Sequence, residues 1–155
     1  MKLHQIHLAP IAYVQNIRSI PEDDDWDNVQ SVITLADHTP TEAPDGIESF
    51  SHLDIIYYFH LVKAEKAVAR SRHPRNNPDW PKVGTYAQRN KSRPNQLGLT
   101  TVQLLRRDER SLVVARLDAI DGTPILDIKP VMKEFLPKGE VIQPAWSTEL
   151  MRGYW

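Results

Sequence analysis

Two short segments combine turn-forming residues with polar side chains at fixed spacing. The first, residues 89–99, reads Arg-Asn-Lys-Ser-Arg-Pro-Asn-Gln-Leu-Gly-Leu. Pro94 fixes its own φ and Gly98 can adopt backbone conformations closed to other residues, so nearby side chains can be held at set angles. The side chains placed in this way are Arg89, Arg93 and Asn95. A basic segment around a structured turn suits a partner that carries phosphate groups.

The second segment, residues 121–130, reads Asp-Gly-Thr-Pro-Ile-Leu-Asp-Ile-Lys-Pro. Asp121 and Gly122 are typical of a tight turn, and Thr123 with Pro124 extends the chain away from it. The strand that follows carries one acid and one base, Asp127 and Lys129. An alternative interpretation of both segments is two hairpin turns and a salt bridge.

The near-neutral net charge of −1 conceals a segregation of charge along the chain. Residues 1–59 hold two Lys/Arg and ten Asp/Glu, residues 60–110 hold twelve and four, and residues 111–155 hold five and six, giving −8, +8 and −1. A basic middle third fits a phosphate-bearing partner. Two other interpretations stay open: the acidic first third folds against the basic middle, or the basic residues form a solvated face.

Composition limits the class of protein. A chain of 155 residues has the size of one domain and can bury a core without metal or disulfide support. The absence of cysteine excludes thiolate nucleophiles and Cys-rich zinc sites, and fits the reducing cytoplasm. No signal-peptide core is present, and the longest apolar run, residues 55–59, is too short to span a bilayer. The six histidines show no metal-binding spacing, so we expect no metal and no membrane.

The elements that must position these side chains are predominantly strands. Period-two patterns and turn signals predict strands at residues 6–16, 29–35, 53–62, 83–87, 98–105, 111–117 and 125–128. Such short strands at this spacing predict a mostly β fold, an antiparallel barrel or sandwich with short helical turns and long loops. The apolar run 53–62 suits a strand buried on both faces, and the proline-rich residues 70–82 suit a long flexible lid.

Two single side chains have two interpretations each. His60 ends the apolar strand, where it either faces a pocket or is a satisfied core histidine. Trp26 follows the acidic run 23–25, which is either a solvated loop or a loop that brings the indole ring over a base. Neither a Gly-x-Gly-x-x-Gly motif nor a Walker-type loop is present, so common dinucleotide and triphosphate sites are not indicated.

Three blocks in order carry a family resemblance: Ser-His-Leu-Asp-Ile-Ile-Tyr-Tyr-Phe-His at 51–60, Val-Gly-Thr-Tyr-Ala-Gln-Arg-Asn-Lys-Ser-Arg-Pro-Asn-Gln-Leu-Gly-Leu-Thr at 83–100, and residues 117–130. Together they resemble the TsaA-like, or YaeB-like, family. Its best-known members use S-adenosylmethionine to methylate N6 of threonylcarbamoyladenosine beside the anticodon of tRNA. The resemblance covers residues 6–136 of a single domain, 1–155, with 137–155 as a short tail. It implies a small antiparallel β-barrel that forms a homodimer, with the cofactor near the interface.

The resemblance also implies a set of site residues. Cofactor contacts fall on His60, Leu61, Arg89, Leu99, Asp121, Gly122, Thr123 and, in the loop 22–29, Trp26. Arg89 would form a fork with the methionine carboxylate, and backbone groups of the turn would contact the adenine edge. The substrate side would hold Lys91, Arg93 and Asn95, and the candidates for a catalytic base are His60 and Asp121.

RNA contacts follow from the same implied function. Phosphates would be bound by Arg70, Arg72, Arg75, Lys82 and Lys91, and an unpaired base would stack on Trp26, Trp80 or Tyr86.

The chain departs from the family pattern at several places, among them Val131, where the family has tyrosine after the Asp-Ile-Lys-Pro run. Gln96 stands where the family usually has proline, and residues 22–29 lack the Pro-Arg-Gln cofactor segment of the tRNA enzymes. Two alternatives therefore stay open: a methyltransferase that acts on a different RNA or on a small molecule, and a noncatalytic protein that binds S-adenosylmethionine.

Overall fold

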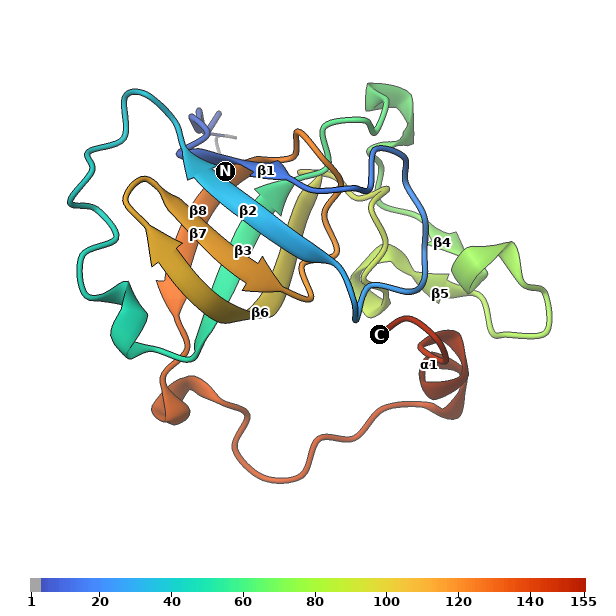
Figure 1. Ribbon diagram of the computed structural model, residues 1–155. Helices are drawn as coiled ribbons and strands as arrows, with labels where there is room; N and C mark the ends of the chain where they lie inside the picture. Colours follow the sequence, from blue (N-terminus) through green and yellow to red (C-terminus); the bar gives the residue numbers. More distant parts are fainter. Residues whose placement is uncertain (1–3) are drawn as a thin grey trace.

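A closed antiparallel barrel forms the body of the protein in the computed structural model, which describes residues 4–155 (Figure 1). Within that range the barrel strands follow the order β1-β2-β7-β6-β3-β8. Their bounds are β1 Ala12–Gln15, β2 Gln30–Leu35, β3 His52–Tyr58, β6 Leu97–Asp108, β7 Ser111–Ala115 and β8 Pro124–Pro130. The barrel predicted from the sequence is confirmed.

The remaining elements are short. Strands β4 (Ser71–Arg72) and β5 (Val83–Gly84) form a separate two-stranded sheet, and α1 spans Ala145–Leu150. Single turns of 3-10 helix span Ile47–Ser49, Ala64–Lys66, Pro74–Asn76, Thr85–Ala87 and Lys133–Phe135. The stretch 83–87, predicted as one strand, is therefore a two-residue strand followed by a helical turn.

The core fills the barrel interior with alternate residues of each strand. On β2, the predicted inward face of Ser31, Ile33 and Leu35 is buried. On β3, Leu53, Ile55 and Tyr57 are buried and the residues between them are not. The prediction that this strand is buried on both faces is wrong, because a closed barrel encloses only one face of each strand.

Two strands begin or end at residues other than those predicted, because pairing with neighbouring strands sets their ends. Residues 6–11 precede β1 without being part of it, and Ile6 and Leu8 are 78% and 63% exposed. Strand β6 is longer than predicted because it pairs with β3 up to Gln103 and with β7 from Gln103 to Asp108, with a bulge between Leu104 and Arg106. The bulge lets one long strand bend around the barrel.

Strand register brings the candidate segments to one end of the barrel. Gln15 lies opposite Val32, and Tyr58 lies opposite Leu97. Gln30 lies opposite Ala115. Residues 16–29, 59–62, 85–96 and 116–123 therefore lie at the same end, which we call the loop end (Figure 1).

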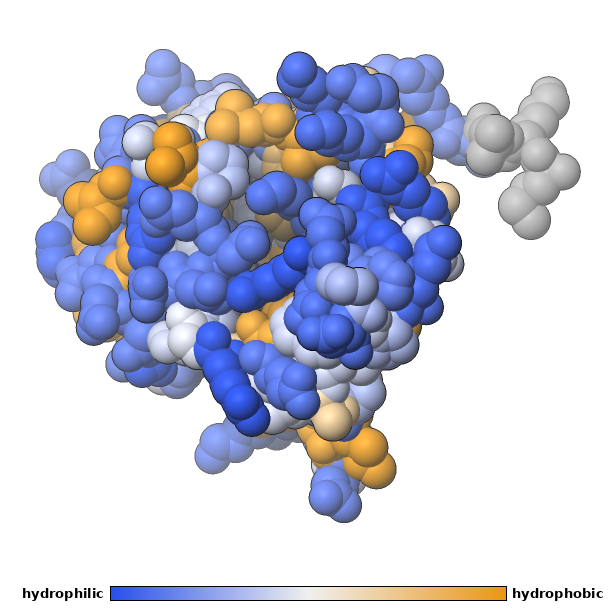
Figure 2. Space-filling model, turned by 90° about the vertical axis from the view of Figure 1, so that its right-hand side faces the viewer, coloured by the Kyte–Doolittle hydropathy of each residue, from blue (hydrophilic) through white to orange (hydrophobic). Residues whose placement is uncertain are grey.

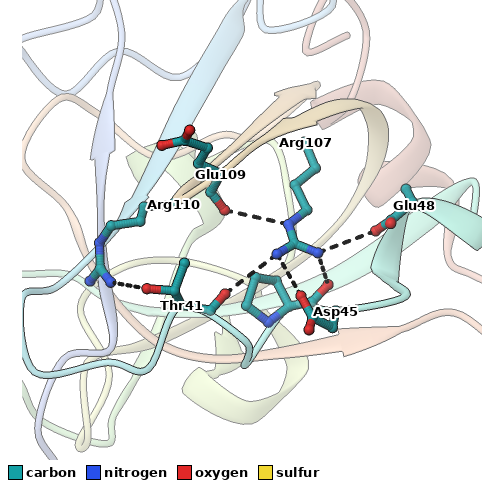
Figure 3. A network of polar contacts seen from close by, with 7 residues as sticks. Thr41, Asp45, Glu48, Arg107, Glu109 and Arg110 are labelled. Atoms are coloured by element: carbon teal, nitrogen blue, oxygen red, sulfur yellow. Dashed lines mark hydrogen bonds and ion pairs between the residues drawn. The ribbon is translucent and has the colours of Figure 1, made fainter.

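The opposite end holds a network of ion pairs (Figure 3). Arg107 Nη2 lies 2.7 Å from Asp45 Oδ1, and Arg107 Nη1 lies 3.6 Å from Glu48 Oε2. Arg110 Nη2 donates to the carbonyl of Ala36 at 2.7 Å. Acidic residues of the first third thus pair with basic residues of the middle third, which fastens the loop 36–46 and accounts for part of the charge segregation.

The segment after residue 144 folds back onto the loop end. Helix α1 is tied to the loop between β4 and β5 by Trp80 Nε1, which donates to Glu149 Oε2 at 2.9 Å. The backbone N–H of Asp25 donates to Gly153 O, and that of Trp26 donates to Tyr154 O, both at 2.9 Å. The predicted short tail therefore packs along the acidic loop.

Candidate functional site

A carboxylate with three hydroxyl donors lies at the loop end. Asp118 Oδ1 accepts from Tyr57 OH at 3.1 Å and from Thr100 Oγ1, and Oδ2 accepts from Tyr154 OH. Burial, with Asp118 nearby, raises the pKa of Tyr57 and of Tyr154 above the ordinary value, so both phenols stay protonated donors. None of these four residues was predicted from the sequence to have a role. The one available signal was an acid, Asp118, directly after a strand.

Gly98 allows the Tyr57 ring to approach the backbone of β6. A Cβ built on Gly98 would lie 2.3 Å from Tyr57 Cε2 and 2.4 Å from Cζ. Glycine is therefore needed here because of a close side-chain approach. The unusual backbone conformation expected of this segment lies instead two residues earlier, at Gln96, which has a φ of 52°.

The buried amide of Gln96 holds the turn that follows β3. Its Nε2 donates to the carbonyls of Phe59 and Val62, each at 3.0 Å, and its Oε1 accepts from Tyr58 OH at 3.0 Å. Its backbone carbonyl accepts from the N–H of Phe59 at 2.8 Å. Proline, usual at this place in the family, could not adopt this φ. The replacement of the family's proline by Gln96 is thus accompanied by a left-handed backbone conformation that proline cannot adopt.

His60 and Leu61 lie in the turn that Gln96 holds. The N–H of His60 donates to Tyr58 O at 2.8 Å, and its half-buried imidazole ring makes no hydrogen bond within residues 4–155. Leu61 is 57% exposed. Both residues therefore lie at the loop end with side chains that are not committed to the core.

Arg89 and Leu99, on which the resemblance places cofactor contacts, are joined by a hydrogen bond. Arg89 Nη2 donates to the backbone carbonyl of Leu99, and the Leu99 side chain is 48% exposed. Burial raises the pKa of Tyr57, and the positive charge of Arg89 acts in the opposite direction. The other N–H groups of Arg89 have no hydrogen-bond partner within the described residues.

The other candidate side chains between residues 89 and 99 differ in whether they are hydrogen-bonded within the protein. Arg93 Nη1 donates to Gln88 O at 3.0 Å. Lys91 and Asn95 are exposed, and their side chains make no hydrogen bond within residues 4–155. The structure thus leaves these two side chains accessible at the loop end and uses Arg93 to support the loop.

The backbone N–H groups of the turn at Asp121 all donate hydrogen bonds within the protein. The N–H groups of Asp121, Gly122 and Thr123 donate to the carbonyls of Arg18, Val14 and Ile120. Gly122 has a φ of 76°, which favours glycine. These three N–H groups are therefore already bonded within the protein, and a contact of the turn with the adenine edge would use its other polar groups. The carbonyls of Asp121 and Gly122 and the Asp121 Oδ2 atom accept no hydrogen bond in the described chain.

Thr123 is only 3% exposed, and Val14 N donates to its carbonyl at 3.0 Å. It supports the turn from inside the barrel. Any ligand contact by this turn falls on Asp121 and Gly122, both of which are exposed.

Trp26 does not present its ring to solvent. It is 2% exposed, and the Arg18 guanidinium carbon lies 5.0 Å from the centroid of its ring. The prediction that Trp26 stacks on a base or contacts the cofactor is therefore wrong for this arrangement, because the loop 22–29 and residues 153–155 enclose the indole. Of the other two rings, Trp80 is bound to Glu149 and Tyr86 is 78% exposed.

The basic residues predicted to bind phosphate divide into two groups. Arg75 Nη2 lies 2.6 Å from Asp24 Oδ1, and half-buried Arg72 donates to Ser92 O at 3.5 Å. Arg70, Lys82 and Lys91 are exposed, and their side chains form no ion pair or hydrogen bond in the range 4–155. The segment 70–82 is therefore fastened by Arg75 and Trp80, where the sequence had suggested a free lid.

Among residues 4–155, no three His, Cys, Asp or Glu side chains gather where they could hold a metal ion. In the same range, no helix has the length and apolar content needed to cross a membrane.

Comparison with known proteins identifies the fold and the family. Residues 12–135 match the family model described as the tRNA-methyltransferase O N-terminal domain. The chain belongs to this family. The resemblance inferred from the three sequence blocks is confirmed, and the family match spans all six barrel strands, β1 to β8.

Curated relatives agree with the family match. The chain is 34% identical over 115 residues to an Escherichia coli tRNA (adenine(37)-N6)-methyltransferase, covering 72% of this chain and 47% of that protein. It is 34% identical over 107 residues to a human protein of the same name, covering 69% and 24%. A Methanothermobacter thermautotrophicus relative, 43% identical over 93 residues (60% of this chain, 64% of the relative), is named a probable S-adenosyl-L-methionine-binding protein.

A solved structure has the same architecture. A crystal structure of TrmO from Pseudomonas aeruginosa superposes with a TM-score of 0.75 at 22% identity, covering 94% of this chain and 63% of that one. This likeness supports the fold. The chain spans less than half the length of the human and Escherichia coli relatives.

Proposed function

We propose that this chain transfers the methyl group of S-adenosylmethionine to N6 of threonylcarbamoyladenosine at position 37 of tRNA. Family membership and the names of the human and Escherichia coli relatives support the reaction. The observation that carries the proposal is the placement of Arg89, Leu99 and the Asp121 turn at one barrel end, where Arg89 and the turn have polar atoms left free and Leu99 has an exposed apolar side chain.

The free groups of the loop end fit the chemistry of the cofactor. Arg89 has N–H groups left to form a charge-assisted fork with the methionine carboxylate. Asp121 Oδ2 can accept from ribose hydroxyls, and the carbonyl of Gly122 can accept from the adenine amino group. Leu61 and Leu99 offer exposed apolar surface. When bound, the cofactor supplies an electrophilic methyl group on a sulfonium.

The residues of the chain act mainly by holding the acceptor in place. Orientation of two bound reactants can by itself account for much of a rate enhancement. The proton released from N6 requires an acceptor, and the candidates are the imidazole of His60 and the free Oδ2 atom of Asp121. Asp118 is occupied by three hydroxyl donors, so we assign it the orientation of Tyr57 and Tyr154.

The surface around the site suits RNA and a second protomer. The face that carries β4, β5 and α1 is mostly hydrophilic (Figure 2), and exposed Arg70, Lys82 and Lys91 can bind phosphates. Leu97 and Leu99 are 38% and 48% exposed on the outer face of β6. We propose that a second copy covers them in a homodimer of single-domain chains. The tRNA substrate and the absence of cysteine support a cytoplasmic location.

The proposal is tested by methyl transfer to tRNA. Protein, radiolabelled S-adenosylmethionine and tRNA that carries unmethylated threonylcarbamoyladenosine are incubated, and the nucleosides are separated and identified by mass. We expect label in the modified adenosine only. A tRNA transcript without the threonylcarbamoyl group is the substrate control, and Arg89→Ala is the site control.

Two outcomes favour the alternatives. Cofactor binding without transfer to tRNA or other RNA would favour a noncatalytic binding protein, the function suggested by the name of the Methanothermobacter relative. Transfer to a small acceptor, with a KM that is insensitive to salt, would exclude RNA as the substrate because phosphate contacts make RNA binding salt-dependent.

A further inference from the structure

A surface hollow lies beside the proposed cofactor site and is not used by it. Its volume is about 420 Å³, and it is lined by Asp27, Thr101, Arg116 and Trp155. Thr101 is two residues beyond Leu99 on β6, so both side chains point to the same face, about 7 Å apart along the strand. A ligand in this hollow would therefore be adjacent to one held by Leu99 and Arg89.

Trp155 offers an exposed aromatic ring on an anchored backbone. The residue is 46% exposed, and its ring meets the Tyr154 ring edge to face, with centroids 5.0 Å apart at 84°. Tyr154 is itself fixed by its hydroxyl on Asp118 and by its carbonyl, which accepts from Trp26 N. An exposed ring held in this way can stack on a flat ligand with little loss of conformational entropy.

Arg116 offers a guanidinium group whose outer edge is free. Its Nε donates to Asp27 Oδ1 at 2.6 Å, which orients the side chain. Its Nη1 and Nη2 atoms have no hydrogen-bond partner among residues 4–155, and the side chain is 52% exposed. Two parallel N–H donors of this kind match two oxygens of a phosphate.

We propose that this hollow binds one unpaired nucleotide next to the methylated adenosine, with its base stacked on Trp155 and its phosphate on the Nη atoms of Arg116. The inference rests on the proposed function, because it makes the RNA strand continue from the acceptor site into the hollow. Stacking on an aromatic ring beside a cationic group is the usual way in which proteins hold single-stranded nucleic acid. The exposed ring for RNA is thus Trp155, while Trp26 is enclosed.

The test uses an RNA stem-loop with a seven-nucleotide loop that contains threonylcarbamoyladenosine. Binding is measured by fluorescence anisotropy, and methyl transfer is measured on the same RNA. Trp155→Ala should weaken RNA binding by about tenfold, since base stacking on an aromatic ring has effects of this order. Trp155→Phe should restore most of the affinity. Phe135→Ala removes an aromatic residue that is 86% exposed, follows β8 and lies outside the hollow, and should change nothing.

A double-mutant comparison locates the base. The nucleotide on each side of the modified adenosine is replaced in turn by an abasic site. One replacement should weaken binding to the wild-type protein and have no further effect on Trp155→Ala. Additive losses at both positions would overturn the proposal, as would wild-type affinity of Trp155→Ala.

A second variant keeps the test valid if Trp155→Ala is unstable. Arg116→Gln should lower the slope of log affinity against log salt by about one, the change expected for one lost phosphate contact. An unchanged slope would contradict the role of Arg116.

Cofactor titration separates this inference from the proposed function. A loss of S-adenosylmethionine affinity in Trp155→Ala would show that the hollow holds the cofactor, and would overturn the nucleotide assignment. Failure of the wild-type protein to methylate the RNA would remove the proposed function and this inference together. Normal methylation with equal RNA affinity in the variants would remove only the inference.

Discussion

Replacement of Gln96 by alanine tests whether one buried amide holds the turn at the loop end. The variant removes three side-chain hydrogen bonds, to Tyr58 OH and to the carbonyls of Phe59 and Val62. Each such bond contributes about 0.5–1.5 kcal/mol net, so we expect the free energy of unfolding to fall by about 2–4 kcal/mol. For a chain of this size that corresponds to a Tm lower by about 5–15 °C.

The backbone conformation supplies a second, independent check. Gln96 has a φ of 52°, a region that disfavours residues with a Cβ. Gln96→Gly removes the same hydrogen bonds but relieves this strain, so it should be less destabilising than Gln96→Ala by up to about 1 kcal/mol.

Urea denaturation followed by circular dichroism measures these differences. Gln103→Ala, on strand β6 that follows Gln96, is a matched control, because Gln103 is exposed and its side chain makes no hydrogen bond within residues 4–155. If Gln96→Ala and Gln103→Ala have equal stabilities, the amide does not hold the turn. If Gln96→Gly is less stable than Gln96→Ala, the left-handed conformation at residue 96 is refuted.

Two further predictions concern the Tyr57 ring and its hydroxyl. Gly98→Ala should lower the free energy of unfolding, measured by urea denaturation, by about 1–3 kcal/mol. The new Cβ would lie 2.3 Å from the Tyr57 ring, which Asp118 holds through the Tyr57 hydroxyl. An unchanged free energy of unfolding would show that the ring moves freely. Because the pKa of Tyr57 and of Tyr154 is raised in the folded state, the unfolded chain releases its phenolic protons at a lower pH than the folded chain does. The free energy of unfolding is therefore retained below about pH 10 and falls above it. The fall in the free energy of unfolding should be at most about 1.4 kcal/mol per pH unit for each phenol. Tyr57→Phe or Tyr154→Phe should reduce that slope. A slope equal to that of the wild-type protein in both variants would contradict the assignment.

The barrel could be predicted from local patterns because its strands follow them. Alternation over β2 fixed which residues face inward, and turn signals placed the connections at residues 90–96 and 118–124. The apolar run of β3 led to the wrong prediction of a strand buried on both faces, because outward residues such as Ile56 are also apolar. Alternation cannot be seen where both faces carry apolar side chains.

The candidate site was predictable only where its residues lie in short motifs. Arg89 and Leu99 are ten residues apart in one motif, and a hydrogen bond joins them in the structure. The partners of Gln96 and Asp118 come from segments far away in the sequence, and no local signal predicts such contacts. The burial of Trp26 depends on Gly153 and Tyr154, more than a hundred residues later, so its exposure could not be judged from the loop alone.

The central claim is that Arg89 anchors S-adenosylmethionine at the loop end. Isothermal titration of the wild-type protein with S-adenosylmethionine should show binding, and Arg89→Ala should abolish it while the circular dichroism spectrum and Tm stay unchanged. Arg106→Ala is the matched control, because Arg106 is an exposed arginine on β6 that pairs only with Asp108 in the described structure. Binding that is lost in Arg89→Ala and retained in Arg106→Ala is the predicted result. Equal affinity in wild type and Arg89→Ala would contradict the account.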